Sequence, residues 1–348
     1  MTYDADPETL DVTRLTPSPP VAAPDAAEAV RSCFGLSGHF ARLPGEADDN
    51  FLLTAADGER SVVKVAHLRA DPAVVGVQVR VLRHIESAAP GLPVPRVRPA
   101  ADGRGWATVP CGPLRGRLVH VLSYLDGDPL RSVTTDQPLR RTLGVTLARL
   151  GQALRGFDDP LVRRPLLWDL GQLPQLRPLA AGRAPDPLVE EQLGRLIAEV
   201  SPRLAAQRTQ LVHNDFSPDN TLISADRRGV AGIIDFGDVT VTALVNDVAI
   251  AAANLLSDDA DLLAPALDLL GGYHATTPLT AAELALLPDL ILGRLVARIL
   301  ISEWRAELFP DNRAYVLRNT PRAWEHLRRL LSIPGEDIAA RIQEATRA

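Results

Sequence analysis

The sequence predicts an α+β protein of two lobes, in which a small sheet-rich lobe precedes a larger, mostly helical lobe. Strand-like segments separated by turn residues occupy much of the stretch 39–125. After residue 139 the apolar residues recur instead at helical spacing. The chain of 348 residues is long enough for one large two-lobed domain or two modest ones. We expect a loose lead-in over 1–22, a first lobe over 23–125 and a second lobe over 126–348.

Composition restricts the class of protein. Hydrophobic residues make up 46% of the chain, so a sizeable core can form, and the net charge of −6 argues against a nucleic-acid partner. Cys33 and Cys111 form no C-x-x-C pattern, which disfavours a disulfide framework or a zinc site. The first residues lack the basic-then-apolar order of a signal peptide, and no apolar run reaches membrane-spanning length. We therefore expect a cytoplasmic protein without membrane contact.

The first lobe is predicted to begin with a short helix and to continue as a meander of three strands, a helix and a hairpin. Turn residues at Ala56-Asp-Gly58 indicate a tight connection between two of the strands. Val77, Val81 and Ile85 recur at helical spacing. The predicted helices cover 25–34 and 71–87, the strands cover 39–43, 50–54 and 60–66, and the arms of the hairpin cover 97–110 and 114–125.

Lys64 is the single lysine among 37 lysine and arginine residues. It lies within the alternating stretch 60–66, the third strand of the meander. A lysine where arginine is used everywhere else indicates a site that needs a compact ammonium rather than a planar guanidinium. The alternative is chance in a chain whose codon usage disfavours lysine. In kinases, a lysine on the third strand binds the phosphates of ATP.

The second lobe is predicted to be helical apart from one short hairpin within 211–238. A connection rich in proline and arginine, 160–183, carries Trp168. The predicted helices cover 139–157, 187–204, 246–257, 262–274, 281–308, 322–331 and 337–345.

Polar side chains in the stretch 211–238 stand directly against apolar, strand-like runs. His213, Asp215 and Asn220 have the spacing H-x-D-x-x-x-x-N, and Asp235 follows an apolar run and precedes Phe236-Gly237. Two carboxylates and an amide on adjacent loops can accept a proton and bind magnesium. An isolated Asp215 would be an ordinary turn or cap, and an isolated Asn220 an Asx turn. The combined spacing is typical of phosphoryl transfer in kinases.

Three further residues of this stretch have supporting or open roles. An ionised Asp235 buried at the end of an apolar strand would be costly without a cation, which favours a metal. His213 is interpreted as structural, holding the loop by hydrogen bonds. Asp247 is interpreted as structural too, either as a helix cap or as a brace beneath the loop. Asp238 could support the metal, face the substrate or be exposed.

At these residues the chain resembles the aminoglycoside phosphotransferase and choline kinase superfamily, which has the protein-kinase-like two-lobed fold. The resemblance implies ATP or GTP with magnesium, bound mainly by the first lobe. It also implies Asp215 as the catalytic base, Asn220 and Asp235 as metal ligands and Lys64 on the phosphates.

The resemblance further implies a hinge for the nucleobase at Leu122, Ser123 and Tyr124. The chain departs from the pattern of this superfamily at two positions. Gln78 stands on the helix facing the lysine, where many relatives have a glutamate, and a lysine–glutamine contact is weaker than an ion pair. Asn214 stands between His213 and Asp215, where many relatives have glycine.

Within the superfamily the likeness is greatest to hydroxylysine kinase and its bacterial relatives. It rests on the stretches 43–51, 92–96 and 245–249 and on a late run from 293 to 324. Those enzymes phosphorylate a hydroxyl group of an amino acid or amino alcohol. The candidate substrate contacts are Asp238, Arg298, Glu303, Trp304 and Tyr315.

Two other functions stay open. The first is an antibiotic kinase for resistance or self-resistance, although Arg298, Arg305 and Arg313 disfavour a polycationic aminoglycoside. The second is a catalytically silent, pseudokinase-like nucleotide-binding protein, which would be expected to lack one of the four catalytic residues. The expected partners are the nucleotide and a small molecule, and the expected state is a monomer or homodimer.

Overall fold

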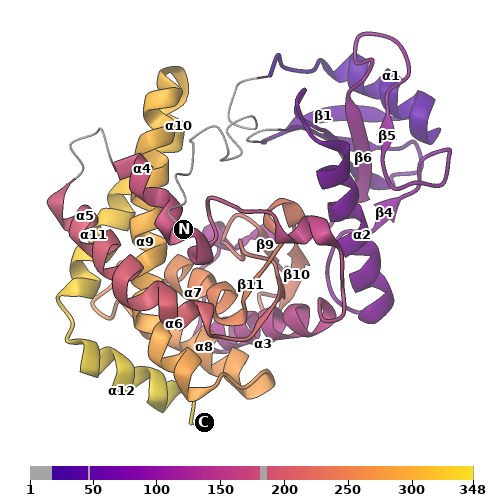
Figure 1. The fold of residues 1–348 in the computed structure, drawn as a ribbon. Coiled ribbons are helices and arrows are strands. Elements are labelled where there is room, and N and C mark those ends of the chain that lie inside the picture. Colours follow the sequence, from indigo (N-terminus) through magenta and orange to yellow (C-terminus); the bar gives the residue numbers. More distant parts are fainter. Residues whose placement is uncertain (1–17, 46–47, 181–185, 348) are drawn as a thin grey trace.

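The computed structural model describes residues 18–45, 48–180 and 186–347. A sheet-rich lobe, drawn in indigo and purple, lies at one end of the molecule, and helices form most of the remainder (Figure 1). This arrangement confirms the predicted fold class. Most of the predicted lead-in 1–22 lies outside the described residues. No helix of the described part is long and apolar enough to cross a membrane.

The first lobe is built on one antiparallel sheet with a helix on each face. Its strands have the order β1-β2-β3-β6-β4, and β5 also pairs with β6. The helices α1 and α2 pack on opposite faces, and α2 begins at an N-cap, Asp71, whose carboxylate accepts from the Ala73 N–H. The elements are α1 (Ala23–Phe34), β1 (His39–Leu43), β2 (Asp49–Thr54), β3 (Arg60–Val65), α2 (Pro72–Ala88), β4 (Val97–Arg98), β5 (Ala107–Thr108) and β6 (Leu118–Ser123).

The predicted hairpin pairs as expected, because both parts of the arm 97–110 that form strands pair antiparallel with β6, in the arm 114–125. Its first arm is not one continuous strand, since β4 and β5 are two residues each. Pro99 follows β4 and Pro110 lies just beyond β5. Proline has no N–H to extend a ladder, so both strands stay short.

Alternation along β3 directs Lys64 to the face of the sheet that carries α2. Val63 and Val65 pack with α1 in one cluster. Lys64 therefore points to the opposite face, as does His120, its cross-strand neighbour on β6. The register of this pair places the single lysine at the boundary between the two lobes.

Two helices of the second lobe approach each other through glycines. They are α3 (Gln137–Ala153) and α8 (Ala264–Thr276). A Cβ on Gly144 would lie 1.9 Å from the Leu269 carbonyl oxygen, and a Cβ on Gly272 would lie 2.0 Å from the Arg141 carbonyl oxygen. Only glycine allows this backbone contact.

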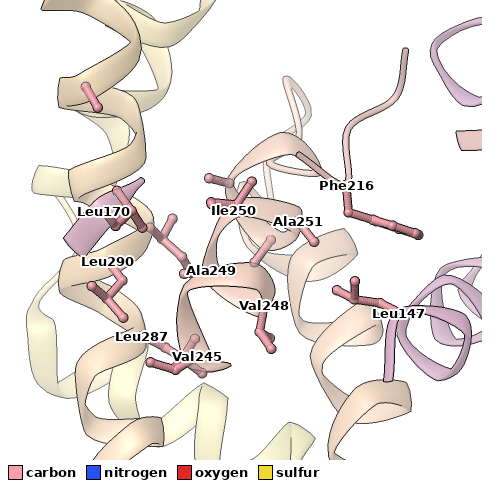
Figure 2. Packing of buried hydrophobic residues seen from close by; sticks show 14 of the residues in the cluster. Leu147, Leu170, Phe216, Val245, Val248, Ala249, Ile250, Ala251, Leu287 and Leu290 are labelled. Carbon is pink, nitrogen blue, oxygen red and sulfur yellow. The ribbon is translucent and has the colours of Figure 1, made fainter. Parts of the chain in front are cut away.

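The centre of the second lobe is α7 (Leu244–Asn254), in which every residue is buried. Eight of its eleven residues are apolar, and a helix that is apolar on most sides belongs in the interior of a protein. Val245 lies beside Leu287 and Leu290 of α9 (Ala281–Leu308), while Leu147 of α3 lies on the other side of α7 (Figure 2). The core thus holds α7 between two long helices.

Two small sheets, rather than one hairpin, stand above α7. The predicted hairpin is present as β9 (Thr221–Ile223) and β10 (Val230–Ile233), with β7 (Asp128–Pro129) added on the far side of β9. A second pair, β8 (Thr209–Val212) and β11 (Thr240–Ala243), was not predicted. The pairing of β8 with β11 brings the loops that follow β8 and β10 close together.

Shorter elements complete the second lobe. The predicted connection 160–183 contains two 3-10 helices and α4, and the predicted helix 187–204 consists of α5, a π-helical turn and α6. Their bounds are Pro160–Arg163, Leu170–Leu176, α4 (Arg177–Ala180), α5 (Pro187–Arg195), Leu196–Val200, α6 (Ser201–Ala205), α10 (Arg313–Val316), α11 (Thr320–Leu331) and α12 (Gly335–Ala345).

Candidate active site

The loop after β8 is held from below by one buried carboxylate. Asp247, on α7, is 3% exposed, and its two oxygens accept from the His213 N–H at 3.3 Å and the Asn214 N–H at 2.8 Å. Asn214 has a φ of 65°, a left-handed conformation that asparagine and glycine adopt most readily. The N-cap position of α7 is Ala243. Asp247 therefore has the geometry of the predicted brace and not of a cap.

His213 ties this loop to the turn after β10. Its Nε2 lies 3.2 Å from the Ile234 carbonyl oxygen, and its Nδ1 accepts from the Asp215 N–H at 3.3 Å. The ring meets Phe236 edge-on at 4.8 Å. Burial lowers the pKa of His213, so the ring is neutral near pH 7, with its proton on Nε2. These contacts fit the structural role predicted for His213.

Asp215 extends from the loop into a partly open position, with 29% of its side chain exposed. The Asn220 Nδ2 donates to its Oδ2 at 2.6 Å, and the Arg294 Nη2 donates to its Oδ1 at 3.5 Å. Burial raises the pKa of the Asp215 carboxyl, and the charge of Arg294 opposes that effect. Because the Asn220 nitrogen faces Asp215, its amide oxygen is left as the atom to bind a cation.

Asp235 lies in a left-handed conformation, with φ 63° and ψ 80°, at the start of the 3-10 turn Phe236–Asp238. The expectation that it is buried is wrong, because 52% of its side chain is exposed. The left-handed turn directs the side chain away from the line of β10 and toward the first lobe. There its Oδ1 lies 3.8 Å from the Lys64 Nζ, which also lies 4.0 Å from the Asp48 Oδ2.

The predicted nucleotide-binding residues lie along the junction of the lobes. Gln78 is 8% exposed on α2, and its Nε2 lies 3.9 Å from the position of a Cβ on Gly237. At the predicted hinge, Leu122 is buried in the large core, and the Ser123 Oγ accepts from the Arg96 N–H at 2.9 Å. The next residue, Tyr124, packs its ring under the guanidinium of Arg60 at 4.6 Å. The side chains of Ser123 and Tyr124 are therefore engaged outside the site.

On the acceptor side, the structure brings two arginines of α9 to Asp215. Arg294 is 3% exposed, donates from Nη1 to the Trp168 carbonyl oxygen at 2.8 Å, and lies 4.9 Å from the Trp168 ring. Arg298, predicted as a substrate contact, follows one turn later and donates from Nη2 to the Asn254 Oδ1. Asp238 acts electrostatically on Arg294, so it belongs to the same surroundings.

Three predicted substrate contacts lie elsewhere. Trp304 is 8% exposed and part of the large core. Glu303 follows Arg294 by about two and a half helical turns, so it lies on the opposite face of α9, where its Oε1 accepts from Trp324 at 3.3 Å. Tyr315, on α10, is 44% exposed and covered by Arg318 at 3.8 Å. Trp304 and Glu303 are therefore engaged in packing away from Asp215, and Tyr315 contacts Arg318 instead.

Arg294 is the residue of this site that sequence reasoning missed. It contacts Asp215, although the two lie far apart in the chain. The available signal was a charge within the apolar stretch 290–297 of a long helix. A buried charge in such a stretch needs a partner, so its position marks a site rather than a surface.

Comparison with known proteins identifies the family. Residues 39–287 match the model of the phosphotransferase enzyme family known as APH. The chain belongs to this family. Over 335 residues it is 26% identical to hydroxylysine kinase of Mus musculus, covering 88% of this chain and 89% of that protein. It is 30% identical over 312 residues to homoserine kinase of Paramagnetospirillum magneticum, covering 86% and 88%.

The fold of this APH phosphotransferase is shared with solved structures. An amicoumacin kinase in complex with AMP-PNP, Ca²⁺ and Ami superposes with a TM-score of 0.64 at 20% identity, covering 86% of this chain and 88% of that one. The family and its relatives define the enzyme class. The protein is a phosphotransferase that acts on hydroxyl groups of small molecules.

The oxygen donors of this phosphotransferase fit a magnesium ion. In the described part of the chain, no group of three or more His, Cys, Asp or Glu side chains could hold a metal by itself. Magnesium commonly takes only one or two protein oxygens, together with waters and phosphate oxygens of the substrate. The amide oxygen of Asn220 and the exposed carboxylate of Asp235 form such a pair.

Proposed function

We propose that this phosphotransferase transfers the γ-phosphoryl group of ATP or GTP, with magnesium, to a hydroxyl group of an amino acid or amino alcohol. One observation supports the proposal above others. Asp215, a carboxylate of raised pKa, stands on the second lobe, while Lys64 reaches Asp235 from the first lobe at 3.8 Å. A proton acceptor and a phosphate-binding cation therefore flank one junction, as phosphoryl transfer requires.

In the proposed mechanism the chain mainly positions and stabilises. Asp215 accepts the proton of the acceptor hydroxyl, and the Asn220 amide fixes the orientation of its carboxylate at 2.6 Å. Burial favours proton acceptance by raising the pKa of Asp215. Lys64 binds phosphate oxygens. Asn220 and Asp235 would hold magnesium, which when bound neutralises charge on the phosphates.

The acceptor class is supported by the relatives and by the charges beside Asp215. The two curated relatives are named for hydroxylysine and homoserine, which are hydroxylated amino acids. Arg294 and, one turn later on α9, the less buried Arg298 place positive charge at the acceptor side. This charge disfavours a polycationic aminoglycoside and so supports an amino acid over the alternative of an antibiotic kinase.

A silent nucleotide-binding protein is the less favoured alternative. Lys64, Asp215, Asn220 and Asp235 are all present, and each has a contact consistent with its proposed role. A cytoplasmic location, a monomeric or homodimeric state and lobe boundaries at 23–125 and 126–348 remain part of the proposal.

The test is nucleotide consumption with ATP and with GTP against hydroxylated amino acids, amino alcohols and aminoglycosides. We expect the highest kcat/KM with an amino acid or amino alcohol, and magnesium dependence throughout. Asp215→Asn should abolish transfer. Asp226→Asn, in the exposed turn between β9 and β10, is the matched control and should leave transfer intact. Full activity of Asp215→Asn on the best acceptor would contradict the mechanism.

A further inference from the structure

One face of α9 presents two guanidinium groups toward the proposed base. Arg294 and Arg298 are four residues apart, which is about one turn and about 6 Å along the helix axis. Arg294 reaches the Asp215 Oδ1 at 3.5 Å. Arg298 also acts on Asp215 electrostatically. The two cations therefore share the surroundings of the acceptor hydroxyl.

The two arginines differ in what neutralises them. The charge of Arg294 is balanced by carboxylates around it, since Asp215, Asp238 and Asp169 all favour its charged form. Its position is also fixed by Trp168, which accepts a hydrogen bond and lies against the guanidinium. Arg294 is thus an internal group, 3% exposed, whose charge is compensated by carboxylates, although its Nε has no hydrogen-bond partner among the described residues.

Arg298 is hydrogen-bonded to a neutral group instead, because its Nη2 donates to the amide oxygen of Asn254. Asp215 and Asp219 favour its charged form from a distance, but no carboxylate among the residues of the described ranges forms a salt bridge with it. Burial and the charge of Arg294 lower the pKa of Arg298 to about 10, so it stays charged at neutral pH. The residue is not fully buried, so part of its surface stays exposed.

A desolvated guanidinium that lacks an anion is unfavourable, and its planar fork matches a carboxylate in bidentate geometry. Asn254 orients Arg298 but is uncharged, so it does not neutralise the guanidinium. The Asn254 Nδ2 in turn lies 3.5 Å from the carbonyl oxygen of Phe216, the residue after Asp215. Asn254 thereby links Arg298 to the loop that carries the proposed base and fixes the position of one relative to the other.

We propose that Arg298 binds the carboxylate of the acceptor, which makes the acceptor a hydroxylated amino acid rather than an amino alcohol. This inference rests on the function proposed above. Arg298 lies about one helical turn beyond Arg294, which contacts Asp215. A linear acceptor in which a few carbon atoms separate the hydroxyl from the carboxylate can span this distance, with its hydroxyl at Asp215 and its carboxylate at Arg298. Arg294 is a positioning residue, which orients the carboxylate of Asp215 and contacts no ligand.

The competing anion is a phosphate group of the nucleotide. The two sources differ in what the loss of Arg298 does. If Arg298 binds the acceptor carboxylate, its removal harms only acceptors that carry this charge. If it binds phosphate, every acceptor suffers equally.

The test compares the best amino acid acceptor with its carboxamide, which has nearly the same shape but no negative charge. We expect Arg298→Gln to lower kcat/KM about 100-fold for the amino acid, mainly through KM, and less than about 3-fold for the carboxamide. Arg298→Lys should recover part of the loss. Arg149→Gln, an exposed arginine of α3, is the matched control and should change neither value. Both acceptors are measured on one variant, so partial unfolding cannot produce the difference.

Arg294→Gln provides the contrasting pattern. It should lower kcat for the amino acid and the carboxamide to the same extent and leave KM nearly unchanged, because Arg294 contacts the Asp215 Oδ1 and no acceptor. Arg294→Lys, which keeps the charge, should recover part of kcat, whereas a purely structural role would not distinguish the two variants.

Equal losses for amino acid and carboxamide in Arg298→Gln would overturn the inference. So would a wild-type enzyme that prefers amino alcohols or aminoglycosides, although that result would keep the protein a small-molecule kinase. Failure of the proposed function would give a different result, which is no phosphoryl transfer to any acceptor of the panel. That result would overturn the inference as well.

Discussion

Asp247→Asn is expected to weaken both the fold and catalysis, although Asp247 contacts no reactant. In the wild type its oxygens accept from the backbone N–H groups of His213 and Asn214. The substitution keeps one oxygen and replaces the other by an NH₂ group. One of the two N–H groups therefore meets a donor, and the loop that carries Asp215 loses half of its support.

The magnitude follows from the two bonds. Loss of one hydrogen bond to a charged group costs about 1.5–3 kcal/mol. Part of this is recovered, because burial raises the pKa of Asp247 and the uncharged amide avoids that desolvation. We expect a net loss of about 1–2 kcal/mol in the free energy of unfolding. Asp247→Ala leaves both N–H groups buried without an acceptor, so it should cost more, about 2–6 kcal/mol.

The assay is urea unfolding at pH 7 together with kcat on the best acceptor. Asp337→Asn, an exposed residue of α12, is the control and should alter neither quantity. We expect kcat to fall in the order wild type, Asp247→Asn, Asp247→Ala. Wild-type stability and kcat in Asp247→Ala would refute the reasoning, because the loop would then be held by something other than this carboxylate.

Three other predictions concern stability. Burial beside Lys64 lowers the pKa of His120 to about 4 from its usual 6.5, so the unfolded state gains a proton first as the pH falls. The wild type should lose about 3 kcal/mol more than His120→Gln between pH 6.5 and 4, and urea unfolding curves that change in parallel would contradict this. Asn214→Gly should be more stable than Asn214→Ala by about 1–2 kcal/mol, because φ is 65° at this position, and equal midpoints in urea would count against it. Gly144→Ala should cost at least about 1–3 kcal/mol, since its Cβ would lie 1.9 Å from the Leu269 carbonyl oxygen. An unchanged melting temperature for that variant would show that α3 and α8 can separate freely.

The parts of the protein that could be predicted from the sequence are those set by local patterns. Alternation placed Lys64 on the third strand of the sheet, and the structure confirms this strand, which pairs with β2 and β6. Helical spacing predicted α9 with its bounds at Ala281–Leu308. The polar site residues of the stretch 211–238 are close together in sequence. Their proximity in the fold could therefore be predicted without knowledge of long-range packing.

Long-range packing accounts for what the sequence could not predict. Asp215 meets Arg294 only because α9 crosses beneath the loop, and no local pattern encodes that crossing. Trp304 resembles a substrate contact by residue type alone, whereas the core on its side of α9 encloses it. Asp235 was expected to be buried because its neighbours in sequence are, and a left-handed backbone conformation reversed that expectation.

If Asp215 and Arg298 bind the two ends of the acceptor as proposed, the central helix α7 fixes the distance between them. Near its start, Asp247 holds the loop of the base, and at its end Asn254 holds Arg298. These two residues lie about two turns, or about 10 Å, apart on one rigid element whose residues are all buried. Under that proposal, the distance between the two groups that bind the acceptor is set by the core rather than by flexible loops. Selection for a longer or shorter acceptor would have to act on side-chain length at either end, since the spacing itself cannot change without repacking the lobe.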